Sequence, residues 1–92
     1  MDVGNEYSEN ENLDRTTIED IAKAIRTIRK QKGLTLRDVE EQSNGVWKSV
    51  VIGSYERCDR TLSLKKAIAL AEFYQVPLDQ LLGLGKNKAS TN

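Results

Sequence analysis

Residues 47–60, WKSVVIGSYERCDR, decide the fold of this 92-residue chain. By local propensity alone, the consecutive β-branched residues Val50, Val51 and Ile52 favour a strand. The neighbouring segments all have helical patterns, however, and a lone strand would leave its backbone N–H and C=O groups unpaired. Placing a β-branched residue in a helix costs roughly a few tenths of a kcal/mol, whereas burying the side chain of Ile52 stabilises the fold by about 1.5–3 kcal/mol. We therefore predict a short helix over approximately residues 48–57.

Four more helices are predicted around this segment, and no strand pair. Their apolar residues recur at three- and four-residue spacing, as in amphipathic helices. Thr16 and Glu19 fit a capping box at the start of the first helix, and Gly33 ends it. Thr35 and Ser63 are candidate N-caps of two others. Three of the predicted helices span residues 17–32, 36–42 and 64–74. The last is a short helix that starts at Pro77, because proline suits the first helical position, and ends before Gly83.

The apolar stripes of these helices define a predicted core. The first helix contributes five residues to it, and the others contribute smaller sets. The predicted inward residues are Ile18, Ile21, Ala22, Ile25 and Ile28, then Leu36 and Val39, then Leu64, Ala67, Ile68, Leu70 and Ala71, and finally Leu78, Leu81 and Leu82.

Composition limits the chemistry that the chain can perform. It has no histidine and one cysteine, Cys58. Histidine is the commonest general base and metal ligand, and no nucleophile–base pair or carboxylate pair in a plausible cleft can be assembled from the rest. The sequence therefore predicts no enzymatic activity, no metal and no cofactor. The polar N-terminus and the absence of a long apolar run predict a cytoplasmic protein without membrane association.

Charge is unevenly distributed, although the formal net charge is zero. Residues 1–20 have seven acidic residues and one basic residue, whereas residues 21–92 have thirteen basic and seven acidic residues. A basic body favours a polyanionic partner. Residues 1–15 are predicted to be a disordered acidic tail, which serves solubility or shields the basic face. The predicted domain spans residues 16–84, and residues 85–92 are predicted to be a flexible tail.

Three segments carry a family resemblance: AIRTIRKQKGLTLRDVEEQS (24–43), VVIGSYERCDR (50–60) and LKKAIALAEFYQVPLDQLL (64–82). Together they resemble the Cro/cI-type (XRE) helix-turn-helix domains, and among these the DNA-binding domain of BldD-type regulators of actinobacteria. The resemblance covers roughly residues 18–83. It implies an all-α, compact five-helix, lambda-repressor-like domain.

The chain departs from the family pattern at two positions. The turn SNGVW, residues 43–47, is about one residue longer than the family's usual turn, which leaves the entry angle of the third helix open. Cys58 stands where the family often has glycine at the end of that helix. A left-handed conformation is strained for cysteine, so a different helix end is an alternative.

The resemblance also implies a site, because in this family the third helix enters the major groove. An internal ion pair between Arg29 and Glu56 is implied to hold that helix in place. Val50 could instead pack inward, and Trp47 could be a packing residue or a DNA wedge. The implied base-contacting residues are Lys48, Ser49, Val50 and Ser54, and the implied phosphate-contacting residues are Thr35, Arg37, Tyr55, Arg57 and Arg60.

The implied function is that of a sequence-specific, double-stranded DNA-binding transcriptional regulator. A repressor that binds a palindromic operator as a homodimer is expected. The leucines of the last helix, together with Leu84, would form the dimer contact or close the core. The alternative is an antitoxin-like or adaptor module that keeps the fold for protein interaction without specific DNA binding.

Overall fold

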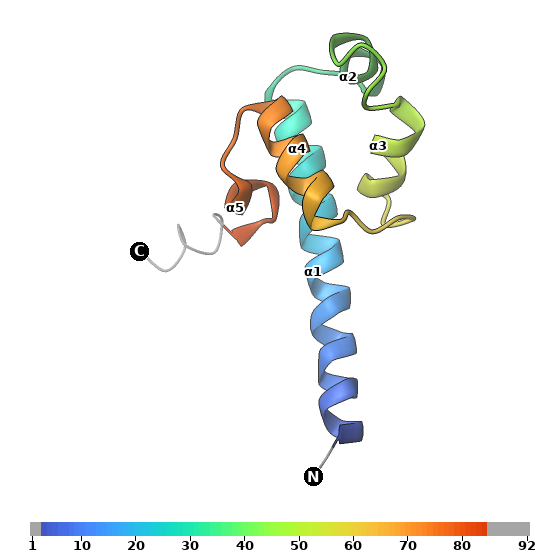
Figure 1. Cartoon of the computed structure of the whole chain (residues 1–92), viewed down its shortest axis with the longest axis vertical. Coiled ribbons are helices and arrows are strands. Elements are labelled where there is room, and N and C mark those ends of the chain that lie inside the picture. Colours follow the sequence, from blue (N-terminus) through green and yellow to red (C-terminus); the bar gives the residue numbers. More distant parts are fainter. Residues whose placement is uncertain (1–2, 85–92) are drawn as a thin grey trace.

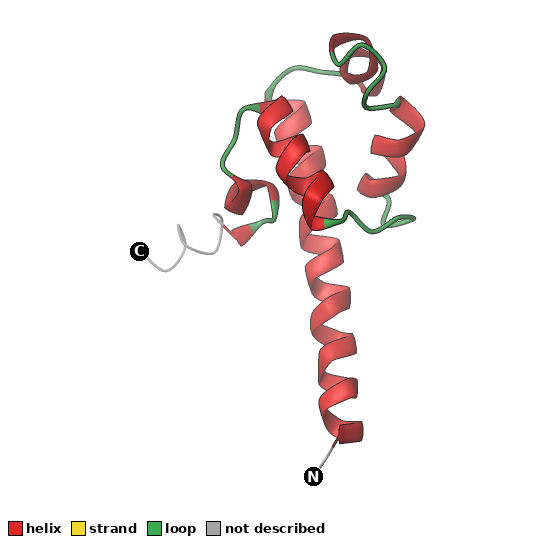
Figure 2. Cartoon of the chain, viewed as in Figure 1, coloured by secondary structure: helices red, strands yellow, loops and turns green. Residues whose placement is uncertain are grey.

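The computed structural model describes the backbone of residues 3–84 and the side chains of residues 17–84. The described chain is all-α (Figure 2), with the helices α1 (Val3–Gln31), α2 (Leu36–Gln42), α3 (Ser49–Glu56), α4 (Leu64–Tyr74) and α5 (Leu78–Leu81). The predicted bounds of α2 and α4 are confirmed. The valine-rich segment that raised the strand alternative is helical, since it forms α3.

The second half of α1 is the centre of the bundle (Figure 1). It packs against α3 on one side and α5 on the other, while α2 packs on α3 and α4 on α5. Every helix contributes to one apolar core, whose largest fully buried side chains are Ile25, Val39, Ile52, Leu70 and Leu81. The core therefore anchors α3 to the bundle through Ile52.

The first helix begins at Val3, so the predicted start at residue 17 is wrong and Thr16 is not its N-cap. The chain is helical over residues 3–15, where disorder was predicted. Extending an existing helix adds one hydrogen bond per residue without a new nucleation cost, and acidic side chains near an N-terminus interact favourably with the helix dipole. This part of α1 projects beyond the other helices (Figure 1). Residues 1–2 and the predicted tail 85–92 lie outside the described residues.

The buried side of α4 agrees with the prediction in part. Ala67, Leu70 and Ala71 are buried as predicted, and Tyr74 extends their stripe at three- and four-residue spacing. Leu64 is 65% exposed and Ile68 is 44% exposed, so their predicted places in the core are wrong. Ile68 lies on the flank of the stripe, and Leu64 is the first residue of the helix. Pro77 is the N-cap residue of α5 rather than its first helical residue.

Local hydrogen bonds fix the helix starts at the predicted caps. Thr35 Oγ1 accepts the backbone N–H of Asp38 at 3.0 Å, and Asp38 Oδ2 accepts the backbone N–H of Thr35 at 2.9 Å, which forms a capping box. The hydrogen bond from the Thr35 backbone is the main cause that lowers the pKa of Asp38. Ser63 Oγ accepts the backbone N–H of Lys66 at 3.2 Å and caps α4.

The end of α3 is a Schellman motif that contains Cys58. The N–H of Asp59 donates to the carbonyl of Ser54 at 2.8 Å, and that of Cys58 to the carbonyl of Tyr55 at 3.2 Å. The motif places Cys58 in the left-handed region, at φ 66°. The helix thus ends as it would with glycine, and the different helix end considered from the sequence is not adopted.

Replacing Cys58 by glycine is expected to stabilise the fold by about 1 kcal/mol. The left-handed conformation of a residue with a Cβ costs about 1–2 kcal/mol of stability. Glycine relieves this strain, but its greater freedom in the unfolded chain offsets part of the gain. Thermal unfolding should show the midpoint rising by about 4–8 °C. The matched control is Cys58→Ser, which keeps the Cβ and should leave the midpoint unchanged. Equal midpoints for the glycine and serine variants would contradict the strain.

Candidate nucleic-acid interface

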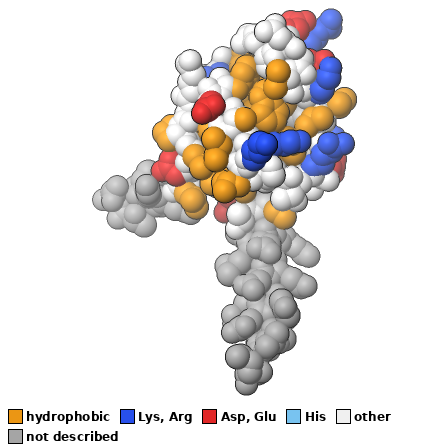
Figure 3. Space-filling view, viewed as in Figure 1, with side chains coloured by type: hydrophobic (Ala, Val, Ile, Leu, Met, Phe, Trp, Pro, Cys, Tyr) orange, Lys and Arg blue, Asp and Glu red, His pale blue; other side chains and the backbone are white. Residues whose placement is uncertain are grey.

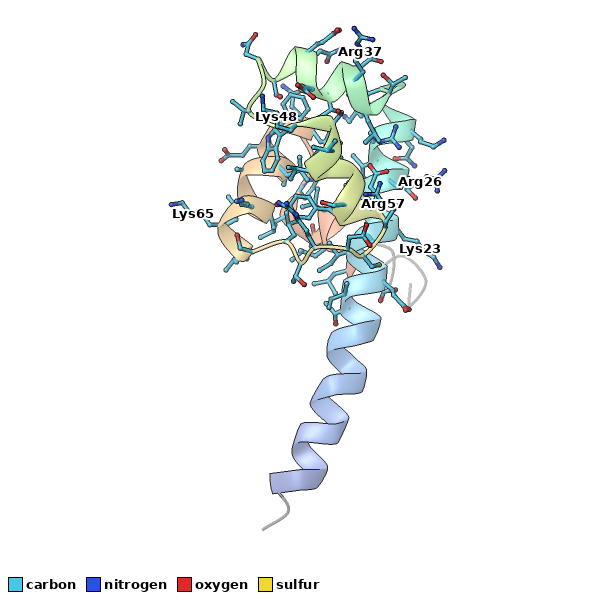
Figure 4. The ribbon with its side chains drawn as sticks, turned by 90° about the vertical axis from the view of Figure 1, so that its right-hand side faces the viewer. Lys23, Arg26, Arg37, Lys48, Arg57 and Lys65 are labelled. Atoms are coloured by element: carbon cyan, nitrogen blue, oxygen red, sulfur yellow. The ribbon has the colours of Figure 1, made fainter. Side chains whose placement is uncertain are left out.

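The N-terminus of α3 presents its side chains to solvent. Val50 is 75% exposed, Lys48 is exposed and Ser49 is half-buried. The alternative in which Val50 packs inward is therefore wrong. Figure 4 views the molecule from the side of α3, with Lys48 near one end of the helix and Arg57 near the other. Three consecutive residues thus form an outward surface at one end of a helix whose other side is core.

Two predicted contact residues are not available on this surface. Ser54, a predicted base contact, is 7% exposed, and its Oγ donates to the carbonyl of Val51 at 2.6 Å. Tyr55, a predicted phosphate contact, is 5% exposed and belongs to the core. Tyr55 follows Ile52 by three residues, so it lies on the same face of α3 and enters the core. Ser54 lies on a different face from Ile52, but it is buried as well, and its hydroxyl is bonded to the backbone of its own helix.

The predicted cations are exposed around α3. Arg37 on α2 lies within 3.4 Å of Glu41 and keeps 86% of its side-chain area exposed, while Arg57 pairs with Asp59 at 3.0 Å and keeps 63%. Arg60 is also exposed. Surface pairs of this kind are weak and are readily exchanged for other anions. In the space-filling view, Lys and Arg side chains gather along the side of the molecule that carries α2 and α3 (Figure 3).

The α1 helix adds cations at the border of the same face. Figure 4 shows Arg26 and Lys23 along one edge of the view centred on α3, Lys65 at the opposite edge and Arg37 at the end near α2. The basic surface therefore extends beyond the helix-turn-helix, over one flank of α1.

Thr35 is exposed, but its polar groups are partly used by the capping box described above. Its Oγ1 and its backbone N–H both have partners on Asp38. The hydroxyl proton remains as the donor that it could offer to a phosphate oxygen.

The ion pair implied for Arg29 and Glu56 is present and joins α1 to α3. Arg29 donates from Nε to Glu56 Oε2 at 2.8 Å and from Nη2 to Oε1 at 2.9 Å, so the pair is bidentate. A third bond runs from Nη1 to the carbonyl of Leu34 at 2.8 Å. The side chains are 10% and 7% exposed. The side-chain hydrogen bond to Glu56 is the main cause that raises the pKa of Arg29, so the guanidinium stays charged.

The buried hydroxyl of Tyr74 lies beside this pair. It has no hydrogen-bond partner among the described residues. Burial is the main cause that raises the pKa of Tyr74, and the nearby negative charge of Glu56 raises it further, whereas Arg29 lowers it. Tyr74 is therefore a neutral packing residue beside the ion pair.

The turn between α2 and α3 contains two side-chain bonds that sequence reasoning missed. Glu40 Oε1 accepts the backbone N–H of Ser49 at 2.8 Å, and Ser43 Oγ accepts that of Trp47 at 2.9 Å. Trp47 is 8% exposed, so it packs in the core and is not a wedge. A signal for these bonds was available: Lys48 precedes α3, and a lysine side chain cannot accept the N–H groups of a helix start.

Gly53 lies where α2 packs on α3. A Cβ at this position would be in ordinary contact with Cδ1 of Leu36, at 3.4 Å, and 3.0 Å from Nη1 of Arg57, which is the movable end of a long side chain. Leu36 of α2 therefore reaches the surface of α3 beside Gly53.

The described residues contain neither a candidate metal-ligand cluster nor a candidate membrane-spanning helix. They contain no group of three or more His, Cys, Asp or Glu side chains that could hold a metal ion. No helix in the described part of the chain has the length and apolar character that crossing a membrane requires.

Comparisons with known proteins agree with this geometry. Residues 25–81 match the helix-turn-helix family. A solved structure, the DNA-binding domain of BldD, is 45% identical and superposes with a TM-score of 0.70 over 72% of this chain and 93% of its own. The BldD DNA-binding domain of S. venezulae gives the same identity and TM-score, with 96% of its own chain covered. Curated protein sequences gave no match. With five helices in its described part, an α3 whose N-terminus is exposed and a family match over residues 25–81, this protein belongs to the Cro/cI-type (XRE) helix-turn-helix family.

Proposed function

We propose that this chain is a sequence-specific transcriptional regulator that binds double-stranded DNA in the cytoplasm, with residues 16–84 as the DNA-binding unit. The family is non-enzymatic, and its domain implies DNA binding. One observation carries the proposal: the N-terminus of α3 presents Lys48 and Val50 to solvent with the half-buried Ser49 between them, and cations lie on the neighbouring α2 and on the loop that follows α3. In a helix-turn-helix, this end of the recognition helix enters the major groove.

Base readout then falls to Lys48, Ser49 and Val50. Lys48 suits the guanine O6 and N7 acceptors, Ser49 can bond to either kind of group, and Val50 suits a thymine methyl. None of the three makes the bidentate contact of an Asn, Gln or Arg, each worth about 1–3 kcal/mol. DNA shape and deformability therefore contribute a larger share of the specificity in this proposal.

The experiment that tests the function is selection from a random DNA library, followed by fluorescence anisotropy on the selected and on unrelated duplexes. A common motif bound at least about a thousandfold more tightly than unrelated DNA supports the proposal. A chain that binds no DNA at low salt points instead to the antitoxin-like or adaptor alternative. Equal binding of all sequences refutes specific regulation.

The same selection tests the proposed homodimer and its palindromic operator. Three outward residues read few bases, and two-fold pairing doubles that number. Leu81 is fully buried, and Leu78 and Leu82 pack against the core. Leu84 is 51% exposed, so it is the leucine of this region that we propose for the dimer contact. Selected sites with two half-sites about one helical turn apart support the dimer. The role proposed for the protein at this operator is that of a repressor.

Arg60 is proposed to contact phosphate, together with Arg37 and Arg57. Arg60→Ala is expected to weaken binding to all sequences about equally and to lower the salt slope of log K by roughly one unit. Anisotropy titrations at several salt concentrations measure the slope. Lys66→Ala, which removes an exposed cation of α4, should leave the slope nearer to its original value. An unchanged slope for the Arg60 variant would count against the contact.

A further inference from the structure

The start of α3 has no cap of its own. Lys48 is its N-cap residue, with extended backbone (φ −67°, ψ 142°) and no side-chain hydrogen bond to the helix. The first N–H groups of a helix need acceptors from outside, and an ammonium group has no lone pair to offer. The acceptor comes from the neighbouring helix α2, where the carboxylate of Glu40 binds the N–H of Ser49 at 2.8 Å.

A second bond holds the other side of Lys48. The backbone N–H of Trp47 donates to Ser43 Oγ at 2.9 Å, and Ser43 Oγ donates to the carbonyl of Glu40 at 3.2 Å. Ser43 is 9% exposed, so this part of the turn is inside the protein. The residues before and after Lys48 are therefore both tied to the last turn of α2.

Glu40 is held as an anion among cations. The bond from the Ser49 backbone is the main cause that lowers its pKa, with further contributions from the Ser49 side chain, Lys48 and Arg37. DNA phosphates would repel a carboxylate beside the proposed base-reading residues Lys48 and Ser49. Attraction to DNA therefore does not account for an acid at this position, whereas a bond that orients α3 does.

We propose that Glu40 is a positioning residue for DNA recognition, whose bond to Ser49 fixes the angle at which the first turn of α3 meets the base edges. The inference rests on the proposed DNA-binding function and adds a residue to its specificity. Hydrogen-bonded readout requires donors and acceptors to be held within about 0.5 Å of their places. The bonds of Glu40 and Ser43 restrict the conformational freedom of the turn that leads into α3.

The test separates the reach of the side chain from its charge. Glu40→Asp keeps the negative charge but is one methylene too short for the bond, and Glu40→Gln loses the charge but keeps an oxygen at the same reach. Glu72→Gln, an exposed acid of α4, is the control for removing a negative charge elsewhere. For each protein, anisotropy measures the dissociation constant of the selected site and of an unrelated duplex at one salt concentration.

The expected result is a ratio of specific to non-specific affinity that falls at least about tenfold in Glu40→Asp and stays within about threefold of the original in Glu40→Gln and Glu72→Gln. The unrelated duplex should bind Glu40→Asp as before. A normal ratio for Glu40→Asp, or an equal loss in both Glu40 variants, overturns the inference. A parent chain that shows no sequence preference overturns the proposed function first, before any variant is made.

Amide hydrogen exchange gives a second readout that does not depend on DNA. The Ser49 N–H should exchange slowly in the parent chain and in Glu40→Gln, and at least about tenfold faster in Glu40→Asp. Fast exchange of this amide in the parent chain shows that the bond is not held, and the inference then fails even if a variant does not fold.

Discussion

Glu56→Ala is expected to destabilise the fold by about 3–5 kcal/mol, because it leaves the buried guanidinium of Arg29 without its carboxylate. The two bonds of 2.8 and 2.9 Å that join α1 to α3 disappear together. For a domain of this size such a loss is a large part of the total stability. Chemical denaturation should show a midpoint shifted strongly downward, or no folded baseline at room temperature.

Two further variants show whether the stranded charge is the cause. Glu41→Ala removes one partner of the surface ion pair between Arg37 and Glu41, in which the Glu41 side chain is 65% exposed. The free energy of unfolding should fall by no more than about 1 kcal/mol. The double variant Arg29→Met, Glu56→Leu removes both charges, and should be more stable than Glu56→Ala alone. It still loses the bond from Arg29 to the Leu34 carbonyl, so full recovery is not expected. A double variant less stable than Glu56→Ala would show that packing, not the charge, sets the loss.

Val50→Glu is expected to lower the affinity for the selected DNA site by at least about 100-fold while leaving the fold intact. The apolar contact with a thymine methyl is lost, worth up to about 1–3 kcal/mol, and a carboxylate enters the groove between two rows of phosphates, where like charges repel. Val50 is 75% exposed, so the core is not disturbed. A negative side chain in the first turn of α3 interacts favourably with the helix dipole, so the melting temperature should stay the same or rise slightly.

Leu64→Glu is the matched control for this variant. Leu64 is likewise exposed, at 65%, and is the first residue of α4. The added charge should change the DNA affinity by no more than about threefold at physiological salt, because screening weakens distant charges. Equal losses for the two variants would mean that net charge, and not the place of Val50 in the groove, governs binding.

The helix bounds and caps of α2 and α4 were predictable because their signals are local. Thr35 and Ser63 each act on a backbone N–H three residues ahead, and Gly33 takes the left-handed conformation that ends α1. The start of α1 was not predictable in this way. The pattern of Thr16 and Glu19 looks like a cap, yet the helix continues through it, since a capping box is one way to begin a helix and does not prevent one from passing.

The site was predictable only in part, because α3 is a two-turn helix. With so few residues the sequence does not define its rotation about its own axis, and outward and inward positions differ by one residue. Val50 was placed outward correctly, but Ser54 and Tyr55 were not. The ion pair of Arg29 and Glu56 came from the family resemblance, since the two residues are 27 positions apart and no local pattern links them.

The sequence by itself determined that this chain is a helical bundle and where most of its helices lie, and its basic body favoured a polyanionic partner. These properties follow from periodicity, capping residues and charge, which act over a few positions along the chain. Tertiary structure alone decided that Leu64 and Ile68 of α4 stay exposed, which residues of α3 remain outside and that Glu40 caps a helix other than its own. Each of these depends on how two helices are rotated against each other, and that rotation is set by filling the core as a whole.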